Sequence, residues 1–461
     1  MQKADLIIIG SGPGGYRAAE YAAGKGLQVV VFEGGALGGT CLNEGCIPTK
    51  TLAHNAEVLL TLAEANELGI ENLQFGFSFS KVLARKQQVV ETLANGIATL
   101  LSQPGITLVR ERACFVSDKV VKAEVSGEEY EAANIIIATG SESKLPPHCN
   151  IDEGAVIDAA SLLSIESLPQ HLCIVGAGVI GMEFASIFNA FGCKVTVVEF
   201  LKECLPAVDD DIAKRLRKSV EKRGVEFFMQ SAVKSVTNAA NGMKCVTFER
   251  KGKEAVVEAD VVLMAVGRKP RVAVVEGTAI VRDERRGIVV DEHFETSVKD
   301  VYAIGDCNGI QMLAHAATMQ GIHVVNRILG IADSIRFDIM PAAVFTHPEV
   351  ACVGATEQQL KDSATAYKAL KGYYRANGKA LAMNASEGVV KLLVDDSSEG
   401  NILGCHIMGA HAADLVQEVA ALMNCRATLA DIHDIIHIHP TLGEVVGSLS
   451  PTLPGREGST N

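Results

Sequence analysis

The feature that most constrains the fold of this chain is a glycine-rich turn between a strand and a helix near the N-terminus. An apolar strand is expected over 5–9, the turn reads Gly10-Ser11-Gly12-Pro13-Gly14-Gly15, and a helix over 16–25 and a strand over 28–32 follow, ending at Glu33. In such a turn the first glycine makes the bend, the second lets a pyrophosphate approach the backbone, and the last packs helix against strand. The carboxylate accepts hydrogen bonds from a ribose. The pattern predicts a dinucleotide-binding βαβ unit.

The same pattern occurs a second time. A strand over 171–175 leads into Gly176-Ala177-Gly178-Val179-Ile180-Gly181, and a helix and the strand 194–198 follow, ending at Glu199. Two such units predict two bound dinucleotides, one of which can be a flavin dinucleotide. A carboxylate at the ribose position repels a 2′-phosphate, so Glu199 favours NAD over NADP. The alternative is that Glu199 is only a solvated surface group.

Two cysteines follow the first unit, in the stretch Gly38–Lys50. In one continuous helix, Cys41 and Cys46 would lie roughly 7.5 Å apart along the axis and roughly 140° around it. That is too far for a disulfide, whose Cα atoms usually lie about 4.4–6.8 Å apart. A bond between them therefore requires a distorted turn, which Gly45 permits and Pro48 can hold.

Several kinds of cysteine site remain open at this point. Ordinary buried thiols are one alternative, because the chain has 12 cysteines. A zinc site is disfavoured because no second Cys/His pair with ligand spacing lies nearby. A plant-type iron–sulfur cluster is disfavoured because the next cysteine is Cys114. A redox-active dithiol is the favoured interpretation.

Length and composition bound the class of protein. The 461 residues are enough for about three domains. A net charge of −13 without a Lys/Arg cluster argues against a nucleic-acid partner, and no apolar run reaches the roughly 20 residues that span a membrane. A strand follows Met1 almost at once, which leaves no room for a signal peptide. Cysteines without regular spacing suit a reducing compartment, so we expect the cytoplasm, or an organelle matrix after removal of a presequence.

The remaining chain alternates helices and short strands before its character changes. Further elements are expected as helices over 53–69, 81–101, 207–224 and 311–330 and as strands over 135–140, 260–265 and 301–304. From about residue 337, strands separated by Gly and Pro turns, followed by helices over 412–424 and 429–435, indicate an α+β unit without a nucleotide signature.

This last unit ends in His437-Ile438-His439-Pro440-Thr441-Leu442-Gly443-Glu444. An imidazole oriented by a carboxylate is a general acid–base couple, and His439 with Glu444 has the residue types for one. On the residues alone, a histidine-rich surface turn is the better interpretation. A metal site at His437 and His439 lacks a third ligand, so we predict no metal.

Taken together, the stretch Gly38–Lys50, the two glycine turns, AIGDCNG (303–309) and HIHPTLGE (437–444) resemble the flavoprotein disulfide reductases over almost the whole chain. The resemblance implies an α/β fold with two Rossmann-like dinucleotide-binding domains, for FAD and NAD, and a C-terminal α+β dimerisation domain. The implied boundaries are 1–150 for the FAD-binding domain, 151–270 for the NAD-binding domain, 271–336 for a central segment returning to the FAD domain and 337–461 for the dimerisation domain.

The resemblance also implies roles for individual residues. Cys41 would exchange with substrate, Cys46 would be the thiolate beside the flavin, and Lys50 would lie near the flavin, paired with Glu183. The base His439, supported by Glu444, would come from the other subunit. FAD is expected at Gly10, Gly12, Gly14, Gly15, Glu33, Thr40, Lys50, Thr139, Gly140, Gly305, Asp306, Ala314 and His315. NAD is expected at Gly176, Gly178, Gly181, Glu199 and Gly267.

Within that family the resemblance is greatest to members that oxidise protein-bound dihydrolipoyl groups with NAD⁺. NADPH-dependent members are disfavoured by Glu199, and no cysteine follows Cys425 to form the C-terminal redox pair of other members. The implied partners are a second copy of the chain, sharing each active site, and a lipoylated acyltransferase or glycine-cleavage carrier protein. Alternatives are an NAD(P)H-dependent disulfide or quinone reductase of the same family, or mainly an assembly subunit of a multienzyme complex.

Two stretches depart from the family's pattern. The run 312–321 lacks the acidic residues usual before its glycine and carries Gln320 there, and the linker 141–167 is divergent. Both lie at the expected edge of the flavin, so they affect the expected flavin contacts and leave the sulfur chemistry unchanged.

Overall fold

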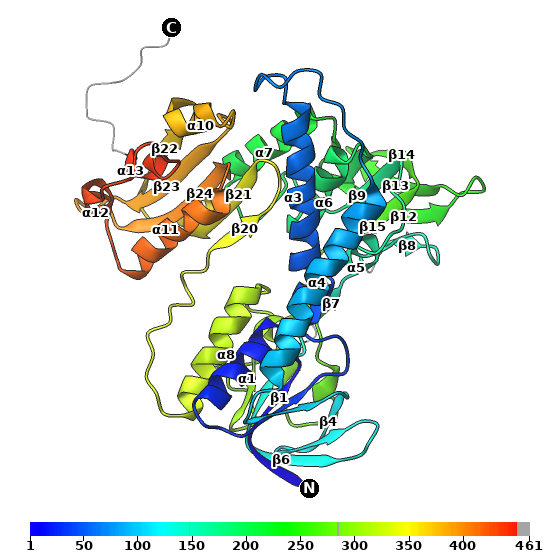
Figure 1. Ribbon diagram of the computed structural model, residues 1–461, viewed down its shortest axis with the longest axis vertical. Coiled ribbons are helices and arrows are strands. Elements are labelled where there is room, and N and C mark those ends of the chain that lie inside the picture. Colours follow the sequence, from blue (N-terminus) through cyan, green and yellow to red (C-terminus); the bar gives the residue numbers. More distant parts are fainter. Residues whose placement is uncertain (147, 284, 450–461) are drawn as a thin grey trace.

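The computed structural model describes residues 1–146, 148–283 and 285–449 and arranges them in three units (Figure 1). The first unit contains a parallel sheet whose strand order is β3 (Ile106–Val109), β2 (Val29–Phe32), β1 (Gln2–Ile9), β6 (Glu129–Ile137) and β19 (Val301–Ala303). β4 (Ala113–Ser117) and β5 (Val120–Ala123) extend it as an antiparallel meander. The continuous apolar run of β1 is buried on both faces, as a central parallel strand requires.

Two helices cover one face of this sheet. α1 (Pro13–Gly24) and α8 (Ala314–Ile328) lie side by side (Figure 1) and pack on the face that carries Leu6 and Ile8. Both α8 and β19 come from the central segment, so the chain returns to the first unit after completing the second. This return was expected from the family resemblance.

The second unit holds the second glycine turn. Its parallel sheet runs β11 (Glu226–Phe228), β10 (Lys194–Val198), β9 (His171–Val175), β15 (Val261–Met264), and a second sheet runs β14 (Lys253–Ala259), β13 (Lys244–Arg250), β12 (Ser231–Asn238), β8 (Asn150–Ile151). α6 (Val179–Ala190) packs on β9 and β10, and α7 (Asp210–Lys222) follows β10. The strands expected over 171–175 and 194–198 are confirmed residue for residue.

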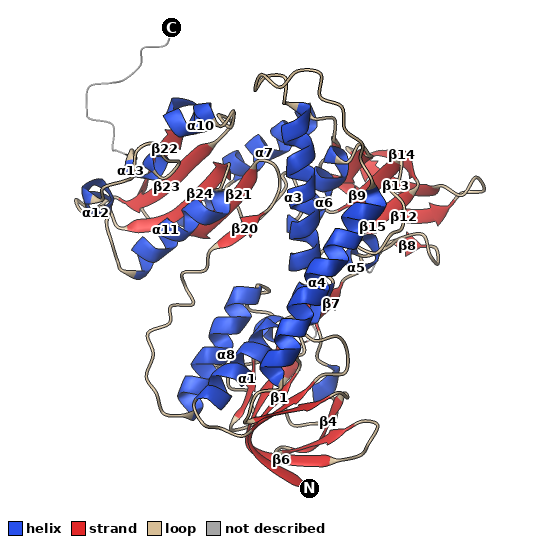
Figure 2. Cartoon of the chain, viewed as in Figure 1, coloured by secondary structure: helices blue, strands red, loops and turns tan. Residues whose placement is uncertain are grey.

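The third unit is a five-stranded antiparallel sheet with helices on it. The order is β20 (Ala342–Val344), β21 (Glu349–Gly354), β24 (Ile402–Gly409), β23 (Val389–Asp395), β22 (Tyr367–Tyr373). α11 (Ala412–Asn424) lies across β21 and β24 (Figure 2), and α12 (Leu429–Asp434) and α13 (Glu444–Gly447) follow. Its last residues, 450–461, lie outside the described residues. The α+β prediction for this part is confirmed.

A short antiparallel ribbon connects the first two units. β7 (Ser141–Ser143) follows β6 of the first sheet, and β16 (Arg268–Pro270) follows β15 of the second. Its first strand, β7, lies inside the linker 141–167 that we described as divergent. The ribbon therefore brings residues of both units to one place.

The prediction of a helix over 53–69 was wrong at both ends. The helix α3 runs over Cys46–Ala63, preceded by α2 (Gly39–Asn43) and followed by α4 (Phe79–Leu101). Apolar periodicity hides its start, because the first turn contains Pro48 and polar residues. Proline is tolerated there, since the first turn of a helix makes no use of its N–H groups. The helix expected over 311–330 is likewise shorter, spanning Ala314–Ile328.

None of the described helices combines the length and apolar composition that crossing a bilayer requires.

A buried lysine joins the second unit to the third. Lys391 of β23 is 0% exposed, and its Nζ lies 3.1 Å from Asp209 Oδ2, 2.8 Å from Asp211 Oδ1 and 2.6 Å from Glu357 Oε2. Asp209 and Asp211 lie at the start of α7, and Glu357 begins α9 (Glu357–Asp362). Burial alone would raise the pKa of Asp211 and Glu357, but hydrogen bonds from lysines, including Lys391, outweigh it and lower both. The three carboxylates are close enough to hold a cation, and the ammonium of Lys391 lies among them.

Replacing Lys391 with Met should lower the free energy of unfolding by about 3 kcal/mol at neutral pH, because it leaves the buried carboxylate of Asp209 without its cation and removes one from the half-buried Asp211 and Glu357. Since the folded pKa values of Asp211 and Glu357 are lowered, the stabilisation is present above the unfolded values of about 4 and is lost as pH falls below them. In urea unfolding, the difference in free energy of unfolding between wild type and Lys391→Met should therefore shrink on acidification. The control is Lys368→Met, which breaks an exposed pair with Asp396 and should cost less than about 1 kcal/mol. Equal costs for the two variants would contradict the expectation.

Candidate active site

Cys41 and Cys46 form a disulfide at the break between α2 and α3. Their Cα atoms lie 4.7 Å apart, a distance that one continuous helix does not allow. Gly45 provides the break with backbone angles φ −144° and ψ −107°. An added Cβ there would lie 3.0 Å from the carbonyl oxygen of Thr40. The distorted turn that the cysteine spacing predicts is confirmed.

The position of Cys46 favours a negative charge on its sulfur. It is the first residue of α3, an 18-residue helix. The N-terminus of a helix carries a partial positive charge, which stabilises a thiolate and lowers a thiol pKa. Reduction of the disulfide would therefore place the Cys46 thiolate at a helix N-terminus that stabilises its charge.

One turn further along α3, Lys50 pairs with Glu183 of α6. The Lys50 Nζ lies 2.9 Å from both carboxylate oxygens, and the Glu183 side chain is 4% exposed. The backbone N–H of Phe345, just beyond β20, donates to Glu183 Oε1 at 2.9 Å, and the Lys50 Nζ lies 4.7 Å from the centre of the Phe345 ring. The pair expected from the family resemblance is present, and all three units meet at it.

The first glycine turn leaves space for a ligand at one position. Gly10 has φ +109°, and a Cβ on Gly15 would collide with the carbonyl oxygen of Gly10. A Cβ on Gly14 would lie 3.2 Å from Cβ of Ala317, so that glycine serves the packing of α1 on α8. Around Gly12, by contrast, no protein atom lies within 4 Å of an added Cβ. The open side of the turn is therefore at Gly12, where a pyrophosphate would approach.

Glu33 is held beside this turn. Its Oε2 accepts from the N–H of Ser11 at 2.9 Å and from the Ser11 hydroxyl at 2.7 Å, and its Oε1 accepts from the N–H of Gly35 at 2.7 Å. Each carboxylate oxygen has two acceptor positions, so the oriented Oε1 retains one for a ribose hydroxyl. The turn and this carboxylate fit the adenosine diphosphate part of FAD.

The second glycine turn repeats this geometry. Gly176 has φ +105°, and a Cβ added to Gly181 would collide with the carbonyl oxygen of Gly176. A Cβ added to Gly178 would have no protein atom within 4 Å. Glu199 is 8% exposed and accepts from the N–H of Ala177 and, at 2.6 Å, from that of Leu201. The second turn fits a dinucleotide in the same way, and Glu199 is an oriented carboxylate, not a solvated one.

The other residues expected at FAD gather around the ends of β6 and β19. Thr139 and Gly140 follow β6, and the Thr139 hydroxyl donates to the Arg271 oxygen at 2.7 Å. Gly305 and Asp306 begin the 3₁₀ turn η2 (Gly305–Asn308) after β19. These segments meet because β6 and β19 are parallel neighbours.

Four further expected residues lie at the margins of this region. Ala314 and His315 begin α8, and the His315 ring hydrogen-bonds the Pro341 oxygen at 2.8 Å. Thr40 of α2 lines a small hollow that also contains Arg268. Gly267, with φ +111°, immediately precedes β16.

Sequence reasoning missed several residues that complete the region. Ser141, Arg268 and Phe345 make the contacts that join the units, yet none of them belongs to a motif. Gln320, which we noted only as a departure, is 1% exposed, and its Oε1 accepts from the N–H of Gly305 at 2.7 Å and from Asn308 Nδ2 at 3.1 Å. An amide oxygen thus provides the acceptor here, and the departure leaves the Gly305 turn intact.

His439 lies in the third unit, apart from the disulfide of its own chain. Its side chain is 81% exposed, and its Nδ1 lies 2.9 Å from Glu444 Oε1. The N–H of Thr441 donates to Glu444 Oε2 at 2.8 Å. That bond, followed by the contact with His439, lowers the pKa of Glu444 and keeps it ionised. His437 instead binds Glu418 at 2.8 Å, so the two histidines have separate partners.

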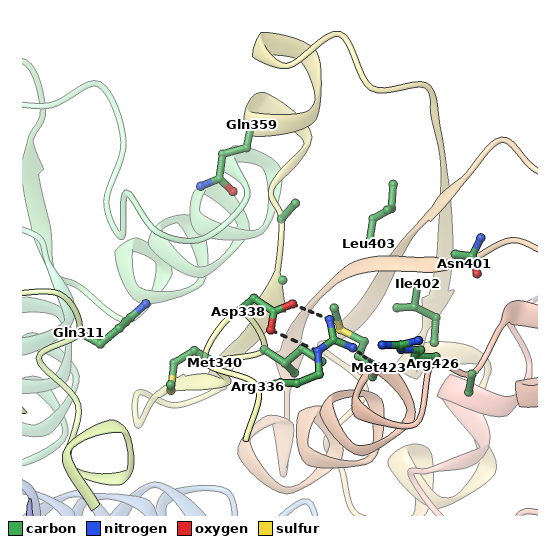
Figure 3. A pocket seen from close by; sticks show the side chains of 14 residues that line it. Gln311, Arg336, Asp338, Met340, Gln359, Asn401, Ile402, Leu403, Met423 and Arg426 are labelled. Carbon is green, nitrogen blue, oxygen red and sulfur yellow. Dashed lines mark hydrogen bonds and ion pairs between the residues drawn. The ribbon is translucent and has the colours of Figure 1, made fainter. Parts of the chain in front are cut away.

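A larger hollow, of about 760 Å³, is shown in Figure 3. It is bounded by the segment that leads into β20, the ends of β21 and α11, and Gln311. Arg336 and Asp338 form an ion pair in its wall, and Arg426 lies near them. Its lining includes no residue of either glycine turn or of the disulfide segment.

Comparison with known proteins decides the family. Residues 4–321 match the model of the pyridine nucleotide-disulphide oxidoreductases, and residues 340–449 match the dimerisation domain of the same family. The chain belongs to this family. Membership confirms the predicted fold, with FAD- and NAD-binding domains and a dimerisation domain, and it supports a homodimer.

Individual relatives agree over nearly the whole length. The chain is 38% identical to dihydrolipoyl dehydrogenase 2, mitochondrial, of Arabidopsis thaliana, covering 96% of this chain and 89% of that one. It is also 38% identical to the dihydrolipoyl dehydrogenase of Bacillus subtilis, covering 96% of both. Among solved structures, the HOCl-induced flavoprotein disulfide reductase RclA from Escherichia coli is 29% identical, with a TM-score of 0.85 over 96% of this chain and 99% of that chain.

The glycine turns allow a direct test of the two nucleotide positions. Gly12→Val should abolish retention of FAD while leaving the fold intact, because an added Cβ there has no protein atom within 4 Å and the side chain fills the approach to the turn. Gly178→Val is the matched control and should weaken binding of NADH while the protein keeps its flavin absorbance. Visible spectra, NADH titration and circular dichroism measure the outcomes. Full flavin content in Gly12→Val would contradict the assignment.

Proposed function

We propose that this protein is an NAD-dependent dihydrolipoyl dehydrogenase, which oxidises protein-bound dihydrolipoyl groups to the lipoyl disulfide. The observation that carries the proposal is the Cys41–Cys46 disulfide at the start of α3, one turn from the Lys50–Glu183 pair and between two nucleotide-binding turns. The full-length likeness to dihydrolipoyl dehydrogenases of a plant and a bacterium supports the same substrate.

The chain's residues would hold two cofactors. The first glycine turn, Glu33 and Asp306 would bind FAD, and the second glycine turn with Glu199 would bind NAD. When bound, FAD accepts the electron pair released by the dithiol and passes it to NAD⁺. Glu199 selects NAD, because a 2′-phosphate would meet its buried carboxylate.

Thiol–disulfide exchange is the chemistry that the protein's own side chains perform. His439 of the partner subunit takes the proton of one substrate thiol, and the resulting thiolate attacks the Cys41 sulfur. The Cys41–Cys46 bond breaks and Cys46 leaves as a thiolate. The second substrate thiol then attacks the substrate sulfur of the mixed disulfide, which closes the lipoyl ring and releases Cys41. Two electrons and two protons have then left the substrate, and the cysteine pair is reduced.

Two positive charges would stabilise Cys46 as the leaving group. The N-terminus of α3 acts on its sulfur directly, and Lys50 is held one turn away by Glu183. Opposite charge lowers a thiol pKa. The thiolate of Cys46, not that of Cys41, is therefore the one we assign to electron transfer.

The position of His439 supports a shared active site. Its side chain is highly exposed, and its hydrogen bond goes to Glu444 rather than to the disulfide segment. Ile436 and Ile438 beside it are 96% and 78% exposed, and burying such side chains favours association of two copies. In the dimer that the family match supports, this segment would bring His439 to the disulfide of the other subunit.

The further partner we propose is a lipoylated acyltransferase or a glycine-cleavage carrier protein, because those proteins carry the substrate group. Ten free cysteines suit a reducing compartment, and we propose the cytoplasm. An NAD(P)H-dependent reductase of other disulfides or quinones is the competing function. Steady-state NAD⁺ reduction with dihydrolipoamide, compared with NADPH oxidation by glutathione disulfide or a quinone, separates the two.

The first test of the mechanism is Cys41→Ser. It should abolish oxidation of dihydrolipoamide, because no disulfide remains to accept the substrate thiolate, while FAD stays bound at the separate glycine turn. The control is Cys425→Ser, an exposed cysteine outside the site, which should retain full activity. Near-normal turnover in Cys41→Ser would show that the pair does not carry the reaction.

The second test is His439→Gln. Loss of general-base catalysis should lower kcat for dihydrolipoamide oxidation by roughly 10²–10⁴. His437→Gln is the matched control, since that residue has its own partner in Glu418. The assignment fails if the His439 variant loses only a few-fold, or if the two variants lose activity equally while remaining dimeric by size-exclusion chromatography.

A further inference from the structure

The ribbon of β7 and β16 carries a chain of polar side chains from the second unit into the first. Arg268 Nε donates to the Ser141 hydroxyl oxygen at 2.7 Å, and Arg268 Nη2 donates to the Ser141 carbonyl oxygen at 2.8 Å. The Ser141 hydroxyl in turn donates to Asp306 Oδ2. Ser141 is 1% exposed, so the middle of this chain is closed to water.

The chemistry of the three groups determines the direction of these hydrogen bonds. A guanidinium has donors only, so the Ser141 oxygen must accept from Arg268. Its single proton is then left for the Asp306 carboxylate, which accepts. Among the described residues, Ser141 is the side-chain donor to that carboxylate, and its hydroxyl donates to Asp306 Oδ2. Oδ1 remains as the acceptor for a hydroxyl group of a polyol.

The charge of Arg268 acts on the same region. Burial lowers the pKa of Arg268, and the carboxylates of Asp306, Glu44 and Asp158 oppose that effect. Glu44 lies between the two redox cysteines in the sequence. It lines, together with Arg268, Asp158 and Thr40, a hollow of about 60 Å³. One guanidinium therefore lies between the carboxylate after β19 and the segment that carries the disulfide.

We propose that Arg268 is a positioning residue for the flavin. Through Ser141 it holds the Asp306 carboxylate in the orientation that accepts a ribityl hydroxyl of FAD, and its charge compensates that carboxylate. The proposal rests on the proposed function, which assigns Asp306 to FAD, whose ribityl chain is its polyol part. Two separable effects follow, one on the affinity for FAD and one on the ease of its reduction.

The alternative is that the ribbon merely joins two units. Its neighbouring residue Lys269 provides the matched control, since it pairs with Glu142 on the same ribbon at 2.8 Å, with side chains 57% and 45% exposed. If the ribbon only joins the two units, substitution of either Arg268 or Lys269 should have similar effects. If Arg268 acts on the flavin, only substitutions of Arg268 and Ser141 should change FAD binding.

The experiment compares Arg268→Met, Arg268→Lys, Ser141→Ala and Lys269→Met with wild type. FAD affinity is measured by fluorescence titration of the apoprotein, and the midpoint potential of the bound flavin by equilibration with redox dyes. Arg268→Met should weaken FAD binding about tenfold, the loss expected for a hydrogen-bonded charge. It should also shift the midpoint potential to a more negative value, because an uncompensated Asp306 disfavours added electrons.

The conservative variants separate orientation from charge. Arg268→Lys should keep the potential close to wild type, since the cation remains, while FAD binding stays weakened, since a lysine lacks the two-pronged contact with Ser141. Ser141→Ala should weaken FAD binding with a smaller shift of potential. Lys269→Met should change neither. If Arg268→Met fails to fold, Arg268→Lys and Ser141→Ala still test the proposal.

Two results would overturn the proposal. One is an affinity and a potential in Arg268→Met that match those of Lys269→Met. The other is a lower melting temperature in the Arg268 variants with an unchanged potential, which identifies a joining role only. Wild-type protein that binds no FAD would instead overturn the proposed function, and this inference with it.

Discussion

The carboxylate of Glu183 is the constraint on which the arrangement of this protein depends. It is almost completely buried, and it is satisfied by Lys50 from α3 and by the backbone N–H of Phe345, close to β20. Removing either contact would leave a buried charge short of partners, which costs several kcal/mol. Because Glu183 and its two partners come from three different units, the mutual placement of the units is set at one point, and that point lies one helical turn from Cys46.

The same geometry separates one pair of cysteines from the buried ones. Cys46 begins a helix and lies near a held ammonium group, and both features favour a thiolate. Burial has the opposite effect elsewhere: it raises the pKa of Cys173 to about 12 and those of Cys193 and Cys352 to about 11. Such thiols stay protonated and unreactive near neutral pH. The fold therefore favours redox chemistry at Cys46 and disfavours it at these buried cysteines.

Much of the candidate site could be predicted from the sequence, and the exceptions share a physical cause. Both glycine turns, the helix break between Cys41 and Cys46, and the strands 171–175 and 194–198 rest on interactions between residues close in the chain. The start of α3 was mispredicted because a proline and polar residues occupy its first turn. The contact between Arg268 and Ser141 was missed because the two residues are 127 positions apart and neither forms a recognisable pattern with its neighbours.

The sequence by itself determined the two nucleotide-binding units, the preference for NAD, and the need for a bend between the redox cysteines. Those properties depend on backbone freedom at glycine, on spacing along a helix and on the charge of one residue, and all of these act locally. Only the tertiary structure decided which charges meet: Lys50 with Glu183, Lys391 with three carboxylates, and Arg268 with Asp306 through Ser141. A buried charge requires a partner, but which partner it finds depends on how distant surfaces pack, because the energy of the contact exists only after the chain has brought them together.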